Sequence, residues 1–332
     1  MIRIGQVALV LAAAALWGAS RITWVEVTSF DGLHGEMSAR TVREASGRIR
    51  GLRPDAVFNP VPLRRVVAAA VENKSGRQAI EGTLFVDATG DGDLCARAGA
   101  RFAQAATDDE HIMAMSLMYR VMGIPAPSED ERRLYINGLT TFWGSRVGHV
   151  DGTSYADLTR AEILARRELA EQVDALKRAH GPQVTLVDSA TTIGVRETRH
   201  ILGDHVLSEH DFETCRKPDD GVVCSAWPME IHEQGRKTTW KHLPDGEYYK
   251  IPYRSLLVRD FSNLLVAGRN FSATHLAQAS ARVAAICCGM GEAAGTAAAM
   301  ALATGNDARA IDVQALLADL ERHGAILDPM AG

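Results

Sequence analysis

Three stretches of the chain have a hydrophobic pattern regular enough to predict an element. Leu264 to Ala267 is a short apolar run that stops at a glycine, which predicts a buried strand followed by a turn. Tyr155 to His180 carries apolar residues at helical spacing with charged residues between them, and Gly181 and a proline follow, so we expect one amphipathic helix with a solvated charged face. Ala308 to His323 has the same period and predicts a second helix. The chain therefore mixes strands and helices.

Shorter patterns predict a hairpin and a helix with a glycine-rich entrance. Leu63 to Val71 and Gln78 to Val86 flank an Asn-Lys-Ser-Gly turn at residues 73–76, which favours a hairpin. Further along, an Ala-rich run is entered through Gly289 and Gly291, and we expect a helix to begin around Gly291. Glycine lets a ligand approach the unpartnered first amides of a helix, so this entrance suits a phosphate or an electron-rich ring carbonyl. Tight packing of a helix of small residues on a sheet explains the same composition.

The composition indicates a globular protein with a large core and two lobes. The chain has 332 residues, of which 46% are hydrophobic and 23% charged. A net charge of -5 without a long basic run argues against a general nucleic-acid surface. The five cysteines show neither a CxxC pair nor the histidine spacing of zinc sites, so we predict no metal. We expect a small-molecule substrate, no nucleic-acid or membrane partner, and allow for a homo-oligomer.

The first twenty residues allow two interpretations. Val7 to Trp17 is an apolar run behind a single Arg3, too short to span a bilayer but suited to the core of a signal peptide cleaved after Ser20. The other interpretation is a short strand and helix, followed by a strand at Arg21 to Val27. We favour the second, and with it a cytoplasmic protein, because the basic start is weak and the cysteine count is odd. Export through residues 1–20 is the alternative.

Three blocks of residues resemble one known family. The first reads NLLVAGR…S.TH…R…GxGxAAGTAA, and the other two are DATGDGD at residues 87–93 and TTIGVRETRHILGDHVLSEHDF at residues 191–212. In this chain the first block consists of Asn263 to Arg269, Ser272, Thr274, His275, Arg282 and Gly289 to Ala298. The order of these residues is similar to that of FAD-dependent oxidoreductases in the glutathione-reductase-like superfamily, over most of residues 71–330.

The resemblance implies a fold, a division of the chain and an activity. The fold would be α/β, with a doubly wound, Rossmann-like FAD-binding domain formed by residues 1–103 and 251–332. An inserted α+β cap domain would cover the substrate with residues 104–250. Hydride would pass between a small-molecule substrate and FAD. No GxGxxG loop occurs in the opening residues, so the alternative is a truncated homologue without a working dinucleotide site, acting in binding or assembly or having no function.

The resemblance also implies which residues bind the cofactor. In one alignment Glu26 ends the second strand and binds the FAD ribose, whereas a second alignment places the same segment later in the fold. The helix beginning around Gly291 would point its amino end at the flavin. The remaining candidates are Ala88, Thr89, Gly90 and Asp91 of the DATGDGD block, Gly268, Arg269 and Ser272 after the apolar run, and Gly289, Gly291, Glu292 and Ala293 at the expected helix entrance.

Arg196, Arg199 and His275 are the catalytic candidates. A guanidinium at a flavin site can pair with a substrate carboxylate or stabilise negative charge on the reduced ring. A histidine can shuttle a proton near neutral pH, and His275 lies inside the longest motif. For the two arginines, a structural ion pair with Glu197 is the alternative.

Two competing motifs fail on their spacing. An EF-hand starting at Asp87 needs a carboxylate or amide at its third position and Glu at its twelfth, where Thr89 and Ala98 stand. The glycines from Gly289 formally fit GxGxxA with Asp312 as the acidic partner, but that pattern requires a second strand, and residues 308–323 predict a helix. Neither calcium nor a nicotinamide nucleotide is expected at these places.

Overall fold

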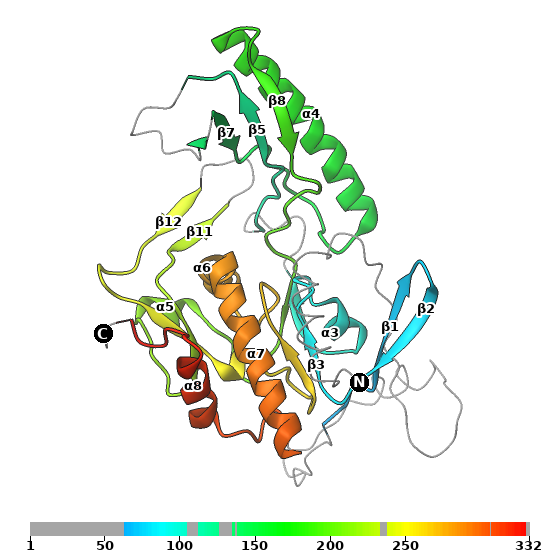
Figure 1. Cartoon of the computed structure of the whole chain (residues 1–332), viewed down its shortest axis with the longest axis vertical. Coiled ribbons are helices and arrows are strands. Elements are labelled where there is room, and N and C mark those ends of the chain that lie inside the picture. The colour runs from blue at the N-terminus through cyan, green and yellow to red at the C-terminus, as the bar shows by residue number, and fades with distance from the viewer. Residues whose placement is uncertain are drawn as a thin grey trace, which may run out of the picture.

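The computed structural model describes residues 63–104, 112–125, 135–136, 138–232, 238–305 and 307–329. These residues form both helices and strands, which confirms the mixed α/β class (Figure 1). The first part of the chain contains β1 (Ala68–Asn73), β2 (Gly76–Glu81), β3 (Phe85–Asp87), α3 (Asp93–Arg97) and β4 (Phe102–Gln104). The middle part contains β5 (Tyr119–Met122), β6 (Tyr135–Ile136), β7 (Leu139–Phe142), α4 (Tyr155–His180) and β8 (Thr185–Ser189).

The last part of the chain returns to the first. Its elements are β9 (Arg199–Ile201), α5 (Glu209–Glu213), β10 (Gly221–Ser225), β11 (Met229–Ile231), β12 (Thr239–Lys241), β13 (Tyr249–Pro252), the 3-10 turn η1 (Tyr253–Ser255), β14 (Leu264–Val266), α6 (His275–Ala281), α7 (Ala284–Thr304) and α8 (Val313–Arg322). β14 pairs in parallel with β3, and β9 pairs antiparallel with β4. Strands from both ends of the chain thus lie side by side.

The sheets are small. The described strands form five two-stranded sheets and one of four strands, ordered β6-β7-β5-β8. Among the described strands, β3 and β14 are the one parallel pair, and one such pair does not establish a doubly wound sheet. The Rossmann-like topology therefore stays a prediction.

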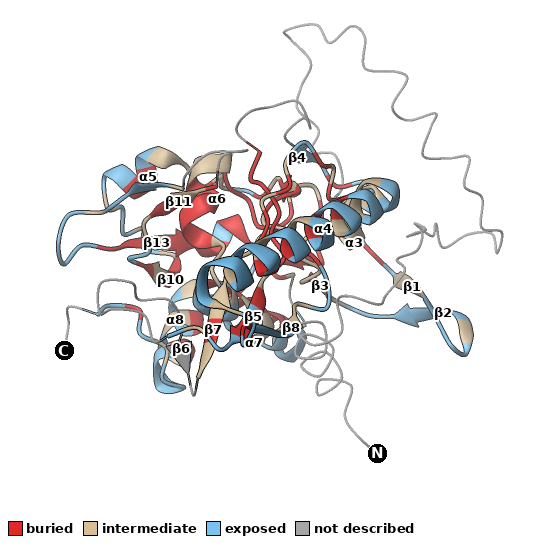
Figure 2. Ribbon diagram, turned by 90° about the horizontal axis from the view of Figure 1, so that it is seen from above, coloured by how far each residue is buried: buried red, intermediate tan, exposed pale blue. Residues whose placement is uncertain are grey.

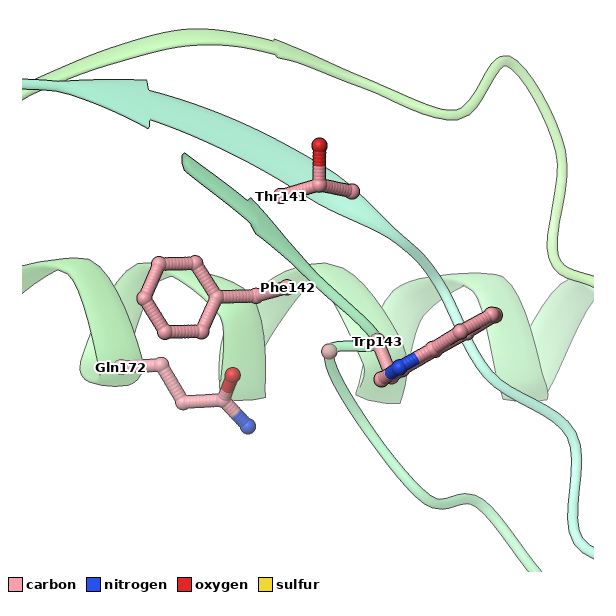
Figure 3. A pocket seen from close by; sticks show the side chains of 5 residues that line it. Thr141, Phe142, Trp143 and Gln172 are labelled. Carbon is pink, nitrogen blue, oxygen red and sulfur yellow. The ribbon is translucent and has the colours of Figure 1, made fainter. Parts of the chain in front are cut away.

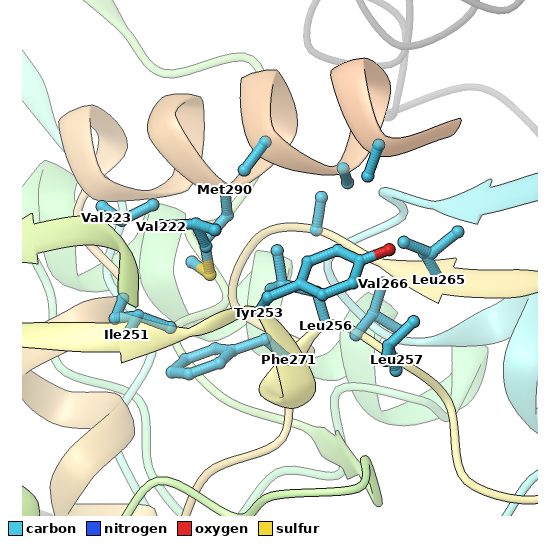
Figure 4. Close-up of a cluster of buried hydrophobic side chains, with 14 of the residues drawn as sticks. Val222, Val223, Ile251, Tyr253, Leu256, Leu257, Leu265, Val266, Phe271 and Met290 are labelled. Atoms are coloured by element: carbon cyan, nitrogen blue, oxygen red, sulfur yellow. The ribbon is translucent and has the colours of Figure 1, made fainter. Parts of the chain in front are cut away.

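One hydrophobic cluster lies along the buried face of α7 (Figure 4). Met290 and four alanines of this helix are fully buried against β10, β14 and their neighbours, and small side chains allow that close approach. By length and hydropathy α7 could cross a membrane. Seven of its residues are nevertheless buried in the protein, which is typical of the core helix of a globular protein.

A second cluster lies between α4 and the four-stranded sheet, at the top of Figure 1. Figure 2 shows the buried stripe along α4. The helix spans the predicted range because Ser154 caps its first turn by accepting a hydrogen bond from the Asp157 amide, and Gly181 ends it with φ of 107°. A cavity of about 350 Å³ lies beside Phe142, Trp143 and Gln172 (Figure 3), and its lining contains no titratable side chain.

Several predicted boundaries were wrong. The first strand of the hairpin, expected at Leu63 to Val71, is β1 at Ala68–Asn73. The strand expected at Gln78 to Val86 is divided into β2, which completes the hairpin, and β3, which leaves it to join β14. The helix expected around Gly291 begins at Ala284, because glycines need not break a packed helix. A Cβ at Gly289 would lie 3.1 Å from Val223 Cγ1, so the missing side chain brings α7 close to β10. The last helix begins at Val313 because Asp312 caps it, accepting from two backbone amides.

Candidate functional site

The DATGDGD block follows β3, and its first aspartate is a structural residue. Asp87 is 1% exposed, and its carboxylate accepts hydrogen bonds from the Thr89 amide at 3.1 Å, the Thr89 hydroxyl at 2.8 Å and the Cys95 amide at 2.8 Å. Burial raises the pKa of Asp87. These bonds fix the turn and the start of α3. Ala88 and Thr89 are half-buried within this turn.

The second aspartate joins the three sequence blocks. Arg269 Nη1, just beyond β14, lies 2.8 Å from Asp91 Oδ1, and the Thr198 hydroxyl donates to the same oxygen at 2.8 Å. Gly90 adopts φ of 78°, and a Cβ there would lie 3.1 Å from Arg269 Nε. Gly268 also has a positive φ, of 104°, where the chain leaves β14. The structure therefore brings the predicted residues Gly90, Asp91 and Arg269 together.

Arg199 holds this turn from the side. Its Nη1 donates to the Asp91 carbonyl at 3.0 Å and to Asp93 Oδ1 at 2.7 Å, and its guanidinium lies 5.4 Å from the centre of the Phe102 ring. Through these contacts Arg199 positions the turn. Its catalytic role stays a prediction.

A buried carboxylate, Glu197, links two histidines. Its Oε1 lies 2.8 Å from His200 Nε2 and 2.7 Å from His275 Nδ1, and its Oε2 accepts from the Met113 amide at 3.2 Å. Burial by itself would raise the pKa of Glu197, but the hydrogen bonds from the two histidines outweigh it and lower that pKa to about 2. The carboxylate is therefore ionised at neutral pH.

An ionised carboxylate can only accept hydrogen bonds, which settles the tautomers of its partners. His200 donates through Nε2–H and His275 through Nδ1–H. Nε2 of His275, the ring nitrogen that does not face Glu197, is buried in the protein. This is the carboxylate–histidine arrangement that orients a general acid or base.

The alternative of an ion pair between Glu197 and the two arginines is not what the described residues form. Arg196 donates from Nη1 to the carbonyl of Ala114, and Arg199 pairs with Asp93. Burial, followed by repulsion from Arg282 and Arg146, lowers the pKa of Arg196 to about 10. His232, near these charges, contacts Glu230 at 2.9 Å.

The remaining predicted residues lie in different surroundings. Ser272 is fully buried, and its hydroxyl has no hydrogen-bond partner among the described residues. Gly289 and Glu292 line a cavity of about 290 Å³ beside β10, and Ala293 is part of the core. Gly289, Gly291, Glu292 and Ala293 are thus inside α7 and do not form its entrance, contrary to expectation. Glu26, residues 1–20 and the rest of the predicted domain before residue 63 lie outside the described residues.

Several residues of the site had no role in the sequence prediction. His200 and Thr198 stand in the predicted TTIGVRETRH block. His200 contacts Glu197 Oε1 from strand β9, although the two residues have the i,i+3 spacing of a helix. Gln278 Nε2 donates to the carbonyls of Arg196 and Arg269, at 3.1 and 3.2 Å. It thereby ties α6 to both blocks. In the sequence, the one signal for the contact between Glu197 and His200 was the histidine three residues after Glu197.

The true start of α7 suits an electron-rich group. Val283 provides no side-chain cap, and Ala284 and Ala285 in the first turn are exposed, so their amides keep free hydrogens at the positive end of the helix. Arg282 immediately before it is half-buried, and its Nε has no hydrogen-bond partner among the described residues. The amides of Ala284 and Ala285, together with Arg269, would fit the carbonyl-bearing edge of a flavin.

Comparison with known proteins identifies a family for this chain. The model of the family named FAD dependent oxidoreductase matches residues 48–142 and 127–320, which is most of the chain. The chain therefore belongs to the FAD-dependent oxidoreductase family. No curated protein and no solved structure matches it.

Proposed function

We propose that this protein binds FAD and catalyses oxidation or reduction of a small molecule. The observation that carries the proposal is the meeting of Asp91, Thr198 and Arg269, one from each motif block, where β3 and β14 end side by side. Family membership supports the cofactor. Bound FAD would supply the capacity to accept or donate hydride.

The residues of this chain would hold the cofactor and a proton. Arg269 and the first amides of α7 would hold the electron-rich part of the flavin. His275, oriented by Glu197, would give a proton to the substrate or take one from it. The unit around α4 would serve as the cap, since its neighbours Met113 and Ala114 contact Glu197 and Arg196 through their backbone.

The first test is an absorption spectrum of the purified protein after incubation with excess FAD and desalting. We expect bands of bound oxidised flavin. A free FAD concentration of 100 times Kd should also stabilise the protein by about 2.7 kcal/mol. A protein that stays colourless and gains no stability would overturn the proposal and favour a homologue that serves in binding or assembly.

Two variants locate the cofactor. Arg269→Gln removes the guanidinium that contacts Asp91, and we expect it to weaken FAD binding roughly tenfold or more. Arg101→Gln is the matched control, because Arg101 forms an exposed ion pair with Asp260 and should leave FAD affinity unchanged. Equal effects of both variants would argue against a cofactor site at Arg269.

A further inference from the structure

Three arginines from separate segments gather around the pair formed by Glu230 and His232. Arg146 follows β7, Arg196 lies between β8 and β9, and Arg282 joins α6 to α7. Arg282 Nη2 donates to the Glu230 carbonyl at 3.2 Å, and Arg146 Nη2 donates at 2.6 Å to the Thr238 hydroxyl, which lies 3.2 Å from His232 Nδ1. Arg196 donates to the carbonyl of Ala114, whose amide donates to the His232 carbonyl at 3.0 Å. Arg282 and Arg146 accordingly both lower the pKa of Arg196. Segments far apart in the sequence thus place like charges in one region, which costs free energy unless something compensates.

The described residues provide little compensation for two of them. Arg196 donates one hydrogen bond, to the carbonyl of Ala114, and Arg282 donates one, from Nη2 to the carbonyl of Glu230 at 3.2 Å. Neither guanidinium forms an ion pair with a carboxylate of the described residues. A guanidinium has five N–H donors in a planar fork, and Nε of Arg282 is buried without a partner in the described part of the chain.

The nearby carboxylates are already engaged by histidines. Glu230 lies 2.9 Å from His232 Nε2, and Glu197 contacts His200 and His275. The pKa of His232 is lowered by burial and further by Arg196 and Arg282, against the opposite effect of Glu230. The region is therefore electropositive even with its own acids included.

The region is also next to the proposed reaction site. Arg196 precedes Glu197, whose carboxylate holds His275, and Gln278 donates to the backbone of both Arg196 and Arg269. We propose that Arg196 and Arg282, with Arg146 beside them, bind the carboxylate of an acidic small-molecule substrate. This assignment deepens the proposed function and rests on it. A planar carboxylate matches the guanidinium fork and neutralises the excess charge.

A negative part of FAD is the other anion that these arginines could bind. The following experiment distinguishes FAD from a substrate carboxylate. The FAD-loaded protein is titrated with acetate, pyruvate, succinate, citrate and benzoate, and with the methyl ester or amide of each. Binding is followed by flavin absorbance and by calorimetry. We expect at least one acid to bind and its neutral analogue to bind roughly tenfold more weakly or not at all.

Variants assign the binding to the arginines. Arg196→Gln should weaken binding of that acid roughly tenfold or more and leave FAD affinity unchanged. Arg196→Lys keeps the positive charge but not the planar fork, so its affinity for the acid should lie between those of the wild type and Arg196→Gln. This intermediate affinity separates recognition of the acid from a folding defect. The control is Arg120→Gln, since Arg120 pairs with Asp188 on the exposed sheet of the second cluster and should have no effect on the acid.

The outcomes distinguish the two proposals. If the protein binds no FAD, the proposed function fails, and calorimetry of the acids on the protein alone still tests the arginine site. If FAD binds but no acid binds better than its neutral analogue, the arginine assignment is wrong. If Arg196→Gln weakens FAD instead of the acid, the arginines belong to the cofactor.

Discussion

At the scale of single residues, the charge of Glu197 is kept in the interior by its partners. A buried carboxylate without hydrogen bonds would become protonated, but here two histidines and one backbone amide donate to it. The same bonds orient His275 at the start of α6. One residue thus contributes both to stability and to the proposed proton transfer.

This arrangement predicts a pH dependence. The pKa of Glu197 falls from 4.5 to about 2 on folding, so its contribution is complete above pH 4.5 and disappears as the pH falls through about 2. Relative to Glu197→Gln, we expect the free energy of unfolding of the wild type to be higher by about 3 kcal/mol at pH 7, with a smaller difference at pH 3.

Urea unfolding between pH 3 and pH 7.5 measures this difference. Glu72→Gln is the control, because Glu72 forms an exposed ion pair with Arg77 and its substitution should have a small effect. A difference between wild type and Glu197→Gln that is the same at pH 3 and pH 7 would show that the Glu197 charge does not stabilise the fold.

At the scale of elements, a glycine determines how β7 leaves the four-stranded sheet. Gly144 adopts φ of 75°, and a Cβ there would lie 1.8 Å from the carbonyl oxygen of Leu117. Gly138, between β6 and β7, has φ of 82° with no atom within 4 Å of the same position. The two positions share a backbone conformation and differ in available space.

Substitution by alanine should separate the cost of the left-handed backbone conformation from the cost of the steric clash. A left-handed conformation costs about 1–2 kcal/mol for a non-glycine residue, and we expect Gly138→Ala to lose about that much. Gly144→Ala must also displace the backbone at Leu117, so we expect a loss of about 3 kcal/mol or more. Urea unfolding and hydrogen exchange of the β5 and β7 amides measure both, and equal losses would contradict the predicted clash.

At the scale of the whole molecule, side chains join segments that are far apart in the sequence. Asn263, which is 3% exposed, donates from Nδ2 to the carbonyls of Val66 and Thr83, at 2.7 and 2.9 Å, and accepts from the Val66 amide at 2.9 Å. It lies directly before β14 and holds the segments before and after the β1–β2 hairpin. These bonds position β3 beside β14, and with them the two motif turns.

Asn263→Asp tests this connection. The aspartate keeps the acceptor but puts an oxygen where Nδ2 donated to two carbonyls, so we expect a loss of about 3 kcal/mol and weaker FAD binding. Asn73→Asp, in the exposed hairpin turn, should change stability by less than about 0.5 kcal/mol. Urea unfolding and a flavin titration of both variants measure this, and an Asn263→Asp protein as stable as wild type would show that these bonds do not hold the strands together.

The sequence by itself determined the local elements and the family. The period of apolar residues gave α4 from Tyr155 to His180, because helical spacing and a terminating glycine are local properties. The order of residues in the motif blocks predicted the family, which the family match confirms. The start of α7 was missed, because glycines inside a helix and glycines at its entrance look alike without the strand that packs on them.

Only the tertiary structure decided which charged groups meet. The sequence put Arg196, Glu197 and Arg199 in one block and allowed an ion pair among them, but folding pairs Arg199 with Asp93 and directs Glu197 to two histidines. The gathering of Arg146, Arg196 and Arg282 likewise depends on three separate segments. Hydrogen bonds and charges act over a few ångströms, so the distances between side chains determine the partners, and only the folded chain fixes those distances.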